Sequence, residues 1–273
     1  MSWTRNPNDG TQLYYEAQGQ GEPLVLIMGL GGSVAAWGMQ WAAFTRAHRV
    51  IALDNRGSGR SDKPDAPYDT AAMADDVLAV MDAAGVASAA VLGVSMGGLI
   101  AQCLYQRAPD RVTRLILAAS GPPIHSPDHE SPTPAAWAAL QRDRYRTDTR
   151  ELIEDLVEVF YHPDYRRRIP NLVDWLVNFE AFQGQPAHAY HRQLAAILDD
   201  RTTPDQLETI TIPTQVIHGR DDRVWPVSNA ERMTARLPYG QLRIVEGAGH
   251  MLMLEQPRAF NSAVLEFTQT QRA

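Results

Sequence analysis

Six short apolar segments, each leading into a turn, constrain the fold of this 273-residue chain more than any other feature. Apolar segments without polar alternation are typical of strands that are covered on both faces in a parallel sheet. We therefore predict a parallel sheet at the centre of the molecule. The six predicted strands are residues 23–28, 48–53, 89–92, 114–118, 214–217 and 241–245.

Helical stretches occupy the intervals between several of these strands. The clearest are residues 70–84, 97–107 and 228–237. Gly85 and Pro109 follow the first two, where residues that stop a helix are expected. Strands that alternate with helices along the chain predict an α/β fold.

The alternation stops between residues 120 and 213, where prolines are followed by aromatic-rich segments with helical spacing. We predict a core domain formed by residues 1–121 and 213–273. An all-helical lid, residues 122–212, is expected to lie over one end of the sheet. We interpret most aromatic side chains of the lid as packing within it. They are Trp137, Tyr145, Phe160, Tyr161, Tyr165, Trp175, Phe179, Phe182 and Tyr190.

Residues 93–98 have the sequence Gly-Val-Ser-Met-Gly-Gly and stand between a predicted strand and a predicted helix. Gly-x-Ser-x-Gly in this context is typical of a nucleophile elbow, a tight turn that projects a serine above the sheet edge. The glycines are needed because neighbouring backbones come close in this strained turn. The N-terminus of the following helix offers unpaired N–H groups to a developing oxyanion. Ser95 is therefore the predicted nucleophile.

A serine hydroxyl is a weak nucleophile and needs a base, which in turn needs a carboxylate to fix its tautomer. His250 lies in a glycine-rich loop after the last predicted strand and is the predicted base. His218 ends an earlier strand and is interpreted as a buried histidine beneath the site. The turn that follows contains two adjacent aspartates, Asp221 and Asp222, and only one of them can face the imidazole.

With these residues the chain resembles the α/β-hydrolase superfamily, in its esterase and enol-lactonase branch, over essentially its full length. The resemblance implies a mostly parallel eight-stranded sheet flanked by helices, an inserted helical lid, and the chain order serine, acid, histidine. In the family's G-x-x-D-x-x-x-P turn the acid is the third residue after the glycine, here Gly219. That residue is Asp222, and Asp221 is then a solvated turn residue or a helix cap.

The same resemblance implies an oxyanion hole made by two backbone N–H groups. Met96 follows the nucleophile and supplies the first. Leu30 supplies the second, from the glycine-rich loop after the strand at residues 23–28. The family often has a histidine before this loop, whereas this chain has Met28, so a hydrogen bond that fixes the loop is lost. A preorganised donor of this kind stabilises the transition state by roughly 3–4 kcal/mol.

Two further motifs are interpreted as structural. Residues 54–61, Asp-Asn-Arg-Gly-Ser-Gly-Arg-Ser, resemble the family's D-x-R-G-x-G-x-S turn and are expected to be braced by Asp54 and Arg56. Asp75 and Asp76, in the helix predicted at residues 70–84, are interpreted as an exposed charge pair. We expect no cofactor and no metal site.

Composition narrows the class of protein. The 25 basic and 32 acidic residues give a net charge of −7, which argues against nucleic-acid binding and attachment to an anionic membrane. Cys103 is the only cysteine, so no disulfide framework is expected. The N-terminus is polar and no apolar run is long enough to span a membrane, so we expect a cytoplasmic protein.

The sequence therefore predicts a serine hydrolase that acts on small carboxylic esters or lactones. Relatives within the superfamily use the same residues for carbon–carbon bond hydrolysis or as cofactor-free perhydrolases and haloperoxidases, so these reactions are alternatives. A ligand receptor on a hydrolase scaffold is the alternative from another class, and the oligomeric state, monomer or homodimer, is left open. The lid arginines are interpreted as a solvated face, with carboxylate recognition as the alternative. They are Arg142, Arg144, Arg146, Arg166, Arg167 and Arg168.

Overall fold

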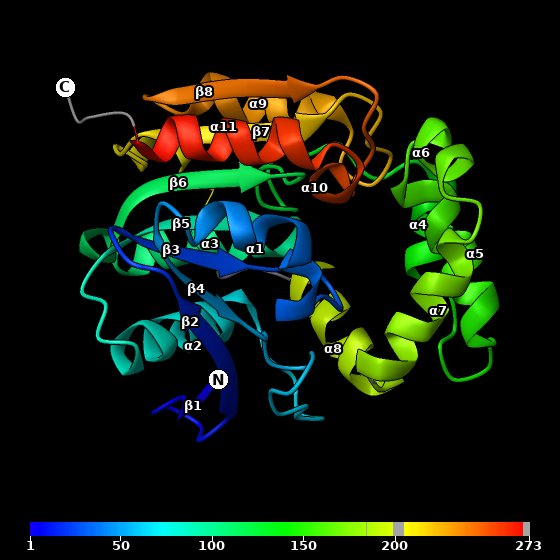
Figure 1. The fold of residues 1–273 in the computed structure, drawn as a ribbon, viewed down its shortest axis with the longest axis horizontal. Coiled ribbons are helices and arrows are strands. Elements are labelled where there is room, and N and C mark those ends of the chain that lie inside the picture. Colours follow the sequence, from blue (N-terminus) through cyan, green and yellow to red (C-terminus); the bar gives the residue numbers. More distant parts are fainter. Residues whose placement is uncertain (184, 199–204, 270–273) are drawn as a thin grey trace.

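The computed structural model describes residues 1–183, 185–198 and 205–269, and its central element is one eight-stranded sheet. The strands are β1 (Ser2–Arg5), β2 (Gln12–Gln18), β3 (Pro23–Ile27), β4 (Arg49–Leu53), β5 (Ala89–Val94), β6 (Val112–Ala118), β7 (Thr214–Gly219) and β8 (Gly240–Val245). Their order is β1-β2-β4-β3-β5-β6-β7-β8 (Figure 1). Strands β3 to β8 run parallel, and β2 is antiparallel to β1 and β4. The expected mostly parallel eight-stranded sheet is confirmed.

All six strands predicted from apolar segments are present, as β3 to β8. The prediction that every one is covered on both faces is wrong for β8, because β8 is the outermost strand. Gln241, Leu242 and Arg243 are exposed there. The search for continuous apolar segments does not predict β1 and β2, because polar residues interrupt the apolar ones in both strands.

Helices cover both faces of the sheet. They are η1 (Val34–Trp37), α1 (Gly38–Phe44), α2 (Thr70–Ala83), α3 (Met96–Arg107), η2 (Pro109–Arg111), η3 (Leu207–Thr209), α9 (Val227–Arg236), α10 (Leu252–Glu255) and α11 (Pro257–Gln269). Val25 and Ile27 of β3 share an apolar cluster with residues of α2, α3 and α9, whereas Leu24 and Leu26 share one with residues of α1 and α11. Because successive strand residues point to opposite faces, each face of β3 is buried under its own layer of helices.

Local signals account for the ends of α2. The Asp69 carboxylate caps its first turn by accepting a hydrogen bond from the Ala72 N–H at 2.8 Å. Beyond its last turn, Gly85 has a φ of +65°, a left-handed conformation that favours glycine. The predicted helix over residues 70–84 is confirmed to within one residue.

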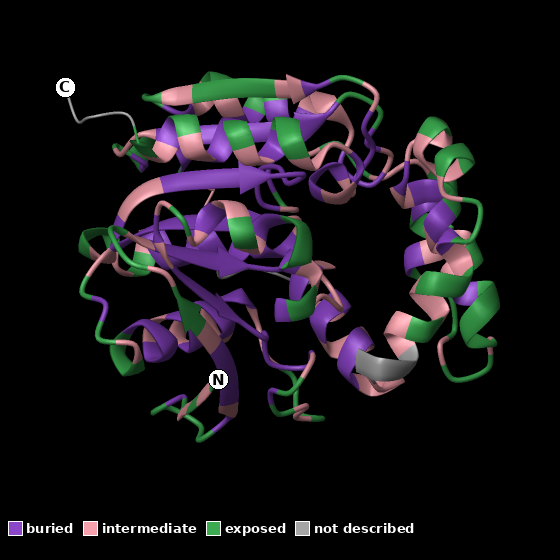
Figure 2. Ribbon diagram, in the orientation of Figure 1, coloured by how far each residue is buried: buried purple, intermediate pink, exposed green. Residues whose placement is uncertain are grey.

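Among the described residues, five α-helices precede η3 in the interval between β6 and β7, in the segment predicted to be a lid, and we call them the lid helices. They are α4 (Pro134–Leu140), α5 (Thr149–Phe160), α6 (Pro163–Arg168), α7 (Leu172–Gln183) and α8 (Ala187–Leu198). In Figure 1 they lie beyond the carboxyl ends of the parallel strands, with α8 nearest the strands. Figure 2 shows β3 to β7 almost wholly buried, whereas these helices alternate between buried and exposed surface. They therefore lie over the edge of the sheet at which β3, β5, β7 and β8 end and the turns that follow these strands begin.

A buried ion pair fixes the turn that follows β4. The Arg56 guanidinium donates to both carboxylate oxygens of Asp76, at 2.6 and 2.7 Å, and both side chains are almost completely buried. Asn6 also donates to Asp76, at 2.7 Å. The prediction of an exposed Asp75 and Asp76 pair is therefore wrong for Asp76, because the helix turns Asp76 inward to neutralise Arg56, and Asp75 is only partly exposed.

Asp76→Ala is expected to lower the free energy of unfolding by about 3–5 kcal/mol, because it removes the main partner of a buried guanidinium. The matched control is Asp75→Ala. Its ion pair with Arg107 lies near the surface and should contribute no more than about 1 kcal/mol. Urea denaturation measures both variants, and equal losses would contradict this assignment.

Candidate active site

Ser95 occupies the turn between β5 and α3 with φ 54° and ψ −119°, a left-handed conformation that is rare for residues other than glycine. The glycines on either side permit this turn. A Cβ atom on Gly93 would lie 2.1 Å from the Gly97 carbonyl oxygen, and one on Gly97 would lie 2.2 Å from the Ile27 carbonyl oxygen. The predicted elbow is present in the structure.

Three side chains from separate loops form one hydrogen-bonded chain. His250 Nε2 lies 3.1 Å from Ser95 Oγ, and His250 Nδ1 lies 2.8 Å from Asp222 Oδ2. His250 and Asp222 are 3% and 5% exposed, so little water competes for these contacts. Ser95 follows β5, Asp222 follows β7 and His250 follows β8, and the parallel strands bring all three loops to one edge of the sheet.

Asp222 is buried and well supplied with partners. Its Oδ1 accepts hydrogen bonds from the Val224 and Trp225 N–H groups at 2.8 and 2.9 Å. Burial by itself would raise the pKa of Asp222, but the nearby His250 and hydrogen bonds from His218 and His250 hold that pKa well below its usual range. The carboxylate is thus ionised at neutral pH.

The structure also separates the two adjacent aspartates. Asp221 is exposed and lies 3.5 Å from His162 of the lid, away from the imidazole of His250. His218 is fully buried, with Nε2 3.3 Å from Asp222 Oδ2 and 2.7 Å from the Trp225 carbonyl oxygen. It thus lies beneath the site, as expected, and it also contacts the carboxylate, a contact that sequence reasoning missed. The spacing of four residues to Asp222 was the available signal.

Residues 28–34, which we call the oxyanion loop, pass directly over Ser95. A Cβ atom on Gly29 would lie 3.0 Å from the Ser95 Cβ, so a larger residue here would force one of the two backbones to shift. Leu30 follows and lines the adjacent cavity. Met96 is the first residue of α3, where a backbone N–H has no carbonyl partner from a preceding turn. The structure brings together both predicted N–H donors and the serine.

Glu255 of α10 connects the loop of His250 to the lid, a role for which the sequence contains no motif. Its carboxylate accepts from the Gly249 N–H at 3.0 Å and from the His162 N–H at 2.7 Å. Burial raises the pKa of Glu255 to about 7, even though these hydrogen bonds lower it. Beside it, the Phe160 ring packs edge-on against the His250 imidazole, with centroids 5.0 Å apart. The end of α5 is therefore attached to the loop that carries His250.

A cavity of about 560 Å³ lies between the lid helices and the loops that carry Ser95, Leu30 and His250. The interpretation of the lid aromatics as internal packing is incomplete, because seven of them line this cavity, although Phe160, Tyr161 and Tyr165 also pack in an apolar cluster within the lid. Tyr145 is exposed, and the side chain of Phe182 lies outside the part that the structure describes. The seven are Trp137, Phe160, Tyr161, Tyr165, Trp175, Phe179 and Tyr190.

The lid arginines divide into two groups. Arg144 lines the cavity, packs over the Tyr190 ring at 3.5 Å, and lies 3.8 Å from Glu180. Arg142, Arg146, Arg166 and Arg167 form ion pairs with acidic residues of the lid, and Arg168 lies over Tyr165. The solvated-face interpretation therefore fails for Arg144, whose side chain is 13% exposed.

Within residues 1–183, 185–198 and 205–269, no cluster of three or more histidine, cysteine, aspartate or glutamate side chains could hold a metal ion. Cys103 lies buried on α3. Among the same residues, no helix has the length and apolar character needed to cross a membrane.

A family model described as the alpha/beta hydrolase fold matches residues 22–257, so the chain belongs to this family of hydrolases. The "Putative carbamate hydrolase RutD" of Caulobacter sp. (strain K31) is 31% identical, over 96% of this chain and 97% of that protein. The 3-oxoadipate enol-lactonase 2 of Acinetobacter baylyi is 31% identical, over 92% and 91% of the two chains. The crystal structure of the enol-lactonase from Burkholderia xenovorans LB400 superposes with a TM-score of 0.83 at 27% identity, over 96% and 98% of the chains.

The raised pKa of Glu255 predicts a pH dependence of stability. Its pKa is about 7 in the folded protein and about 4.5 in an unfolded chain, so the folded state holds the proton more tightly. The stability that this proton confers is present below pH 4.5 and is lost as the pH rises to about 7. Glu255→Gln should therefore have a flatter dependence of unfolding free energy on pH over this range than the wild type.

Urea denaturation at pH 4.5, 6 and 7.5 measures this slope. Glu246→Gln is the control, because Glu246 is an exposed carboxylate whose side chain is 71% accessible. That variant should keep the slope of the wild type. If Glu255→Gln kept it as well, burial of Glu255 would not be its source.

Proposed function

We propose that this hydrolase cleaves carboxylic esters or lactones through an acyl-enzyme formed on Ser95. One observation carries the proposal: a serine–histidine–carboxylate chain ends at the wall of a mostly apolar cavity. Buried polar groups that meet a ligand-sized apolar cavity are the usual arrangement of a small-molecule site.

In this proposal His250 takes the proton of Ser95 as its oxygen attacks the substrate carbonyl carbon. Asp222 keeps the proton on Nδ1, so Nε2 is free to act as the base, and it stabilises the imidazolium that forms. The Leu30 and Met96 N–H groups donate to the oxyanion of the tetrahedral intermediate. His250 then protonates the leaving alkoxide, and later it activates the water that hydrolyses the acyl-enzyme.

We assign residues 122–212 to a lid whose helices form the outer wall of the substrate cavity. The cavity volume of about 560 Å³ falls within the range of roughly 300–1,000 Å³ that is typical of small-molecule sites. Its aromatic and aliphatic walls favour a substrate with a sizeable apolar group beside the carbonyl. Two of the relatives are named for an enol-lactone and a carbamate, which share a carbonyl carbon bonded to a heteroatom.

The activity test is hydrolysis of p-nitrophenyl esters of increasing acyl length. Each methylene buried in the cavity is worth about 0.8 kcal/mol, so kcat/KM should rise about fourfold per carbon until the cavity is full. Ser95→Ala should lower kcat by roughly 10⁴-fold or more while the fold is retained. Steady-state kinetics with a thermal unfolding curve measures both effects.

Ser228→Ala is the matched control, because Ser228 lies on the surface and donates to Glu130. It should keep wild-type turnover. Equal turnover in Ser95→Ala and the wild type would refute the proposal. A single burst without steady release would identify a ligand receptor. A wild type inactive on all esters and lactones but active on a carbon–carbon substrate or in perhydrolysis would replace the proposed reaction with that one.

A further inference from the structure

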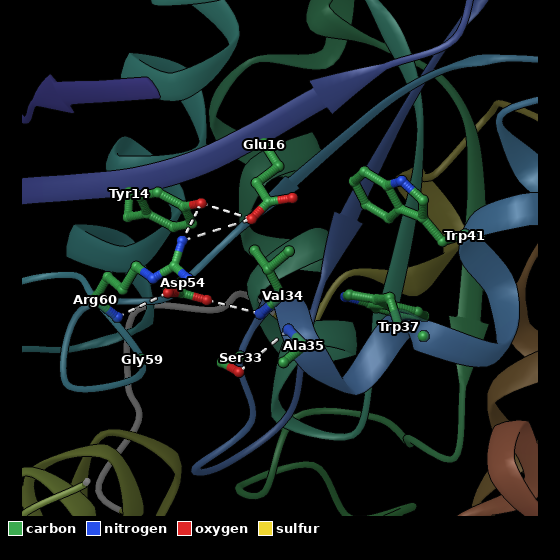
Figure 3. A pocket seen from close by; sticks show the side chains of 11 residues that line it. Tyr14, Glu16, Ser33, Val34, Ala35, Trp37, Trp41, Asp54, Gly59 and Arg60 are labelled. Atoms are coloured by element: carbon green, nitrogen blue, oxygen red, sulfur yellow. Dashed lines mark hydrogen bonds and ion pairs between the residues drawn. The ribbon is translucent and has the colours of Figure 1, made fainter. Parts of the chain in front are cut away.

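The oxyanion loop is held from both sides of the active site. The core domain holds its ends: Asn55 Nδ2 donates to the Met28 carbonyl at 2.8 Å, and the Val34 N–H donates to Asp54 at 2.6 Å. Figure 3 shows Asp54 in the wall of a second cavity, accepting from Val34 on one side and from the Arg60 N–H on the other. These contacts leave the middle of the loop, over Ser95, unsupported by the turn after β4.

The middle of the loop is held by the lid. The Gly31 N–H donates to Oε1 of Gln193, at 2.9 Å, across 162 positions of sequence. Gln193 lies on α8 and is completely buried. Its Nε2 donates to the Arg56 carbonyl at 2.7 Å and to Ser58 Oγ at 2.9 Å. One lid side chain therefore joins the oxyanion loop to the turn after β4.

The hydrogen-bonding capacity of Gln193 is fully used. Its Oε1 accepts a second hydrogen bond, from Gln185 Nε2 at 3.1 Å, and Gln185 also donates to the Gly57 carbonyl at 2.9 Å. A side-chain amide has two donor hydrogens and two acceptor lone pairs, and all four have partners here. Each hydrogen bond that a buried amide fails to make destabilises the folded protein. This network therefore allows one orientation of Gln193.

The first residue of the loop, Met28, explains why a lid residue is needed. Met28 stands where the family often has a histidine that fixes the loop, and its thioether has no hydrogen to donate. Its side chain packs under the loop instead: a Cβ atom on Gly32 would lie 2.3 Å from the Met28 Cγ. Gly31 also has a φ of +73°. One local hydrogen bond closes this turn, from the Gly32 N–H to the Gly29 carbonyl at 3.0 Å, and it leaves the Gly31 N–H to be held by Gln193.

The contact with Gly31 bears directly on the proposed oxyanion donor. Only the φ and ψ angles of Leu30 separate the Leu30 N–H from the Gly31 N–H, so holding one orients the other. We propose that Gln193 is a positioning residue, which acts through Gly31 to aim the Leu30 N–H at the oxyanion. The role in catalysis rests on the proposed serine hydrolase function, whereas the role in holding the loop does not.

The main variant is Gln193→Met, which keeps the length of the side chain and removes its polar atoms. A misaimed donor weakens binding of the transition state but not of the substrate, so kcat should fall about 10- to 100-fold while KM changes less than about threefold. The inhibition constant of an alkylboronic acid should rise by a similar factor, because its tetrahedral adduct with Ser95 also places an oxygen in the oxyanion hole. The pH profile of kcat should keep its shape, since His250 is untouched.

Hydrogen exchange tests the structural half of the proposal without activity. The peptide that covers residues 28–34 should exchange faster in Gln193→Met than in the wild type. The matched control is His188→Leu, which removes another hydrogen bond between α8 and the core, from His188 to the Lys63 carbonyl. It should leave kcat, boronate binding and exchange of the loop as in the wild type.

Each outcome has one meaning. Unchanged exchange of the loop in Gln193→Met would overturn the proposal. Faster exchange with unchanged kcat and boronate binding would overturn the catalytic role. A wild type that hydrolyses no ester or lactone would refute the proposed function, while exchange would still decide whether Gln193 holds the loop. If Gln193→Met fails to fold, Gln193→Asn serves in its place, because its shorter amide cannot reach both Gly31 and Arg56.

Discussion

The left-handed backbone of Ser95 is the constraint on which the rest of the site depends. Such a conformation costs a non-glycine residue roughly 1–3 kcal/mol and persists only where the surroundings impose it. Here the Ser95 N–H donates to the Ala118 carbonyl, and the close approach of Gly97 to the Ile27 carbonyl presses the start of α3 against β3. Since the oxyanion loop leaves the end of that same β3, the serine and the loop above it are positioned by one packing contact.

The second requirement is a negative charge kept away from water. Asp222 meets it with two backbone N–H groups on one oxygen and two histidines near the other. These partners come from the end of β7, from the turn after it and from the loop after β8, so the charge of Asp222 holds that turn and that loop together. Glu255 then joins the second loop to the lid, and burial, with the charge of Asp222 added to it, raises the pKa of Glu255.

Features encoded within a few residues could be predicted from the sequence, whereas features encoded by distant partners could not. The elbow at Ser95 and the six apolar strands have local patterns, and both were found. Nothing in the residues around Asp76 distinguishes it from an exposed aspartate. It is buried because it pairs with Arg56, which is distant in the sequence. Gln193 meets Gly31 across 162 positions, so no spacing rule could relate them. The lid aromatics have the periodicity of a packed helix, and a helix that faces a cavity has the same periodicity.

The lid contacts the catalytic loops through Gln193 and through the backbone that Glu255 binds. These contacts also limit how the substrate range of such an enzyme can change. The walls of the cavity come from the lid, but so do the amide that holds the oxyanion loop and the backbone that Glu255 binds. A lid exchanged for that of a relative would bring new walls and, unless it also presented an amide at the same place, a loosened loop over the serine. Substrate range and turnover are thus coupled in this chain, and a recombined lid must be chosen for its buried polar contacts before its apolar surface.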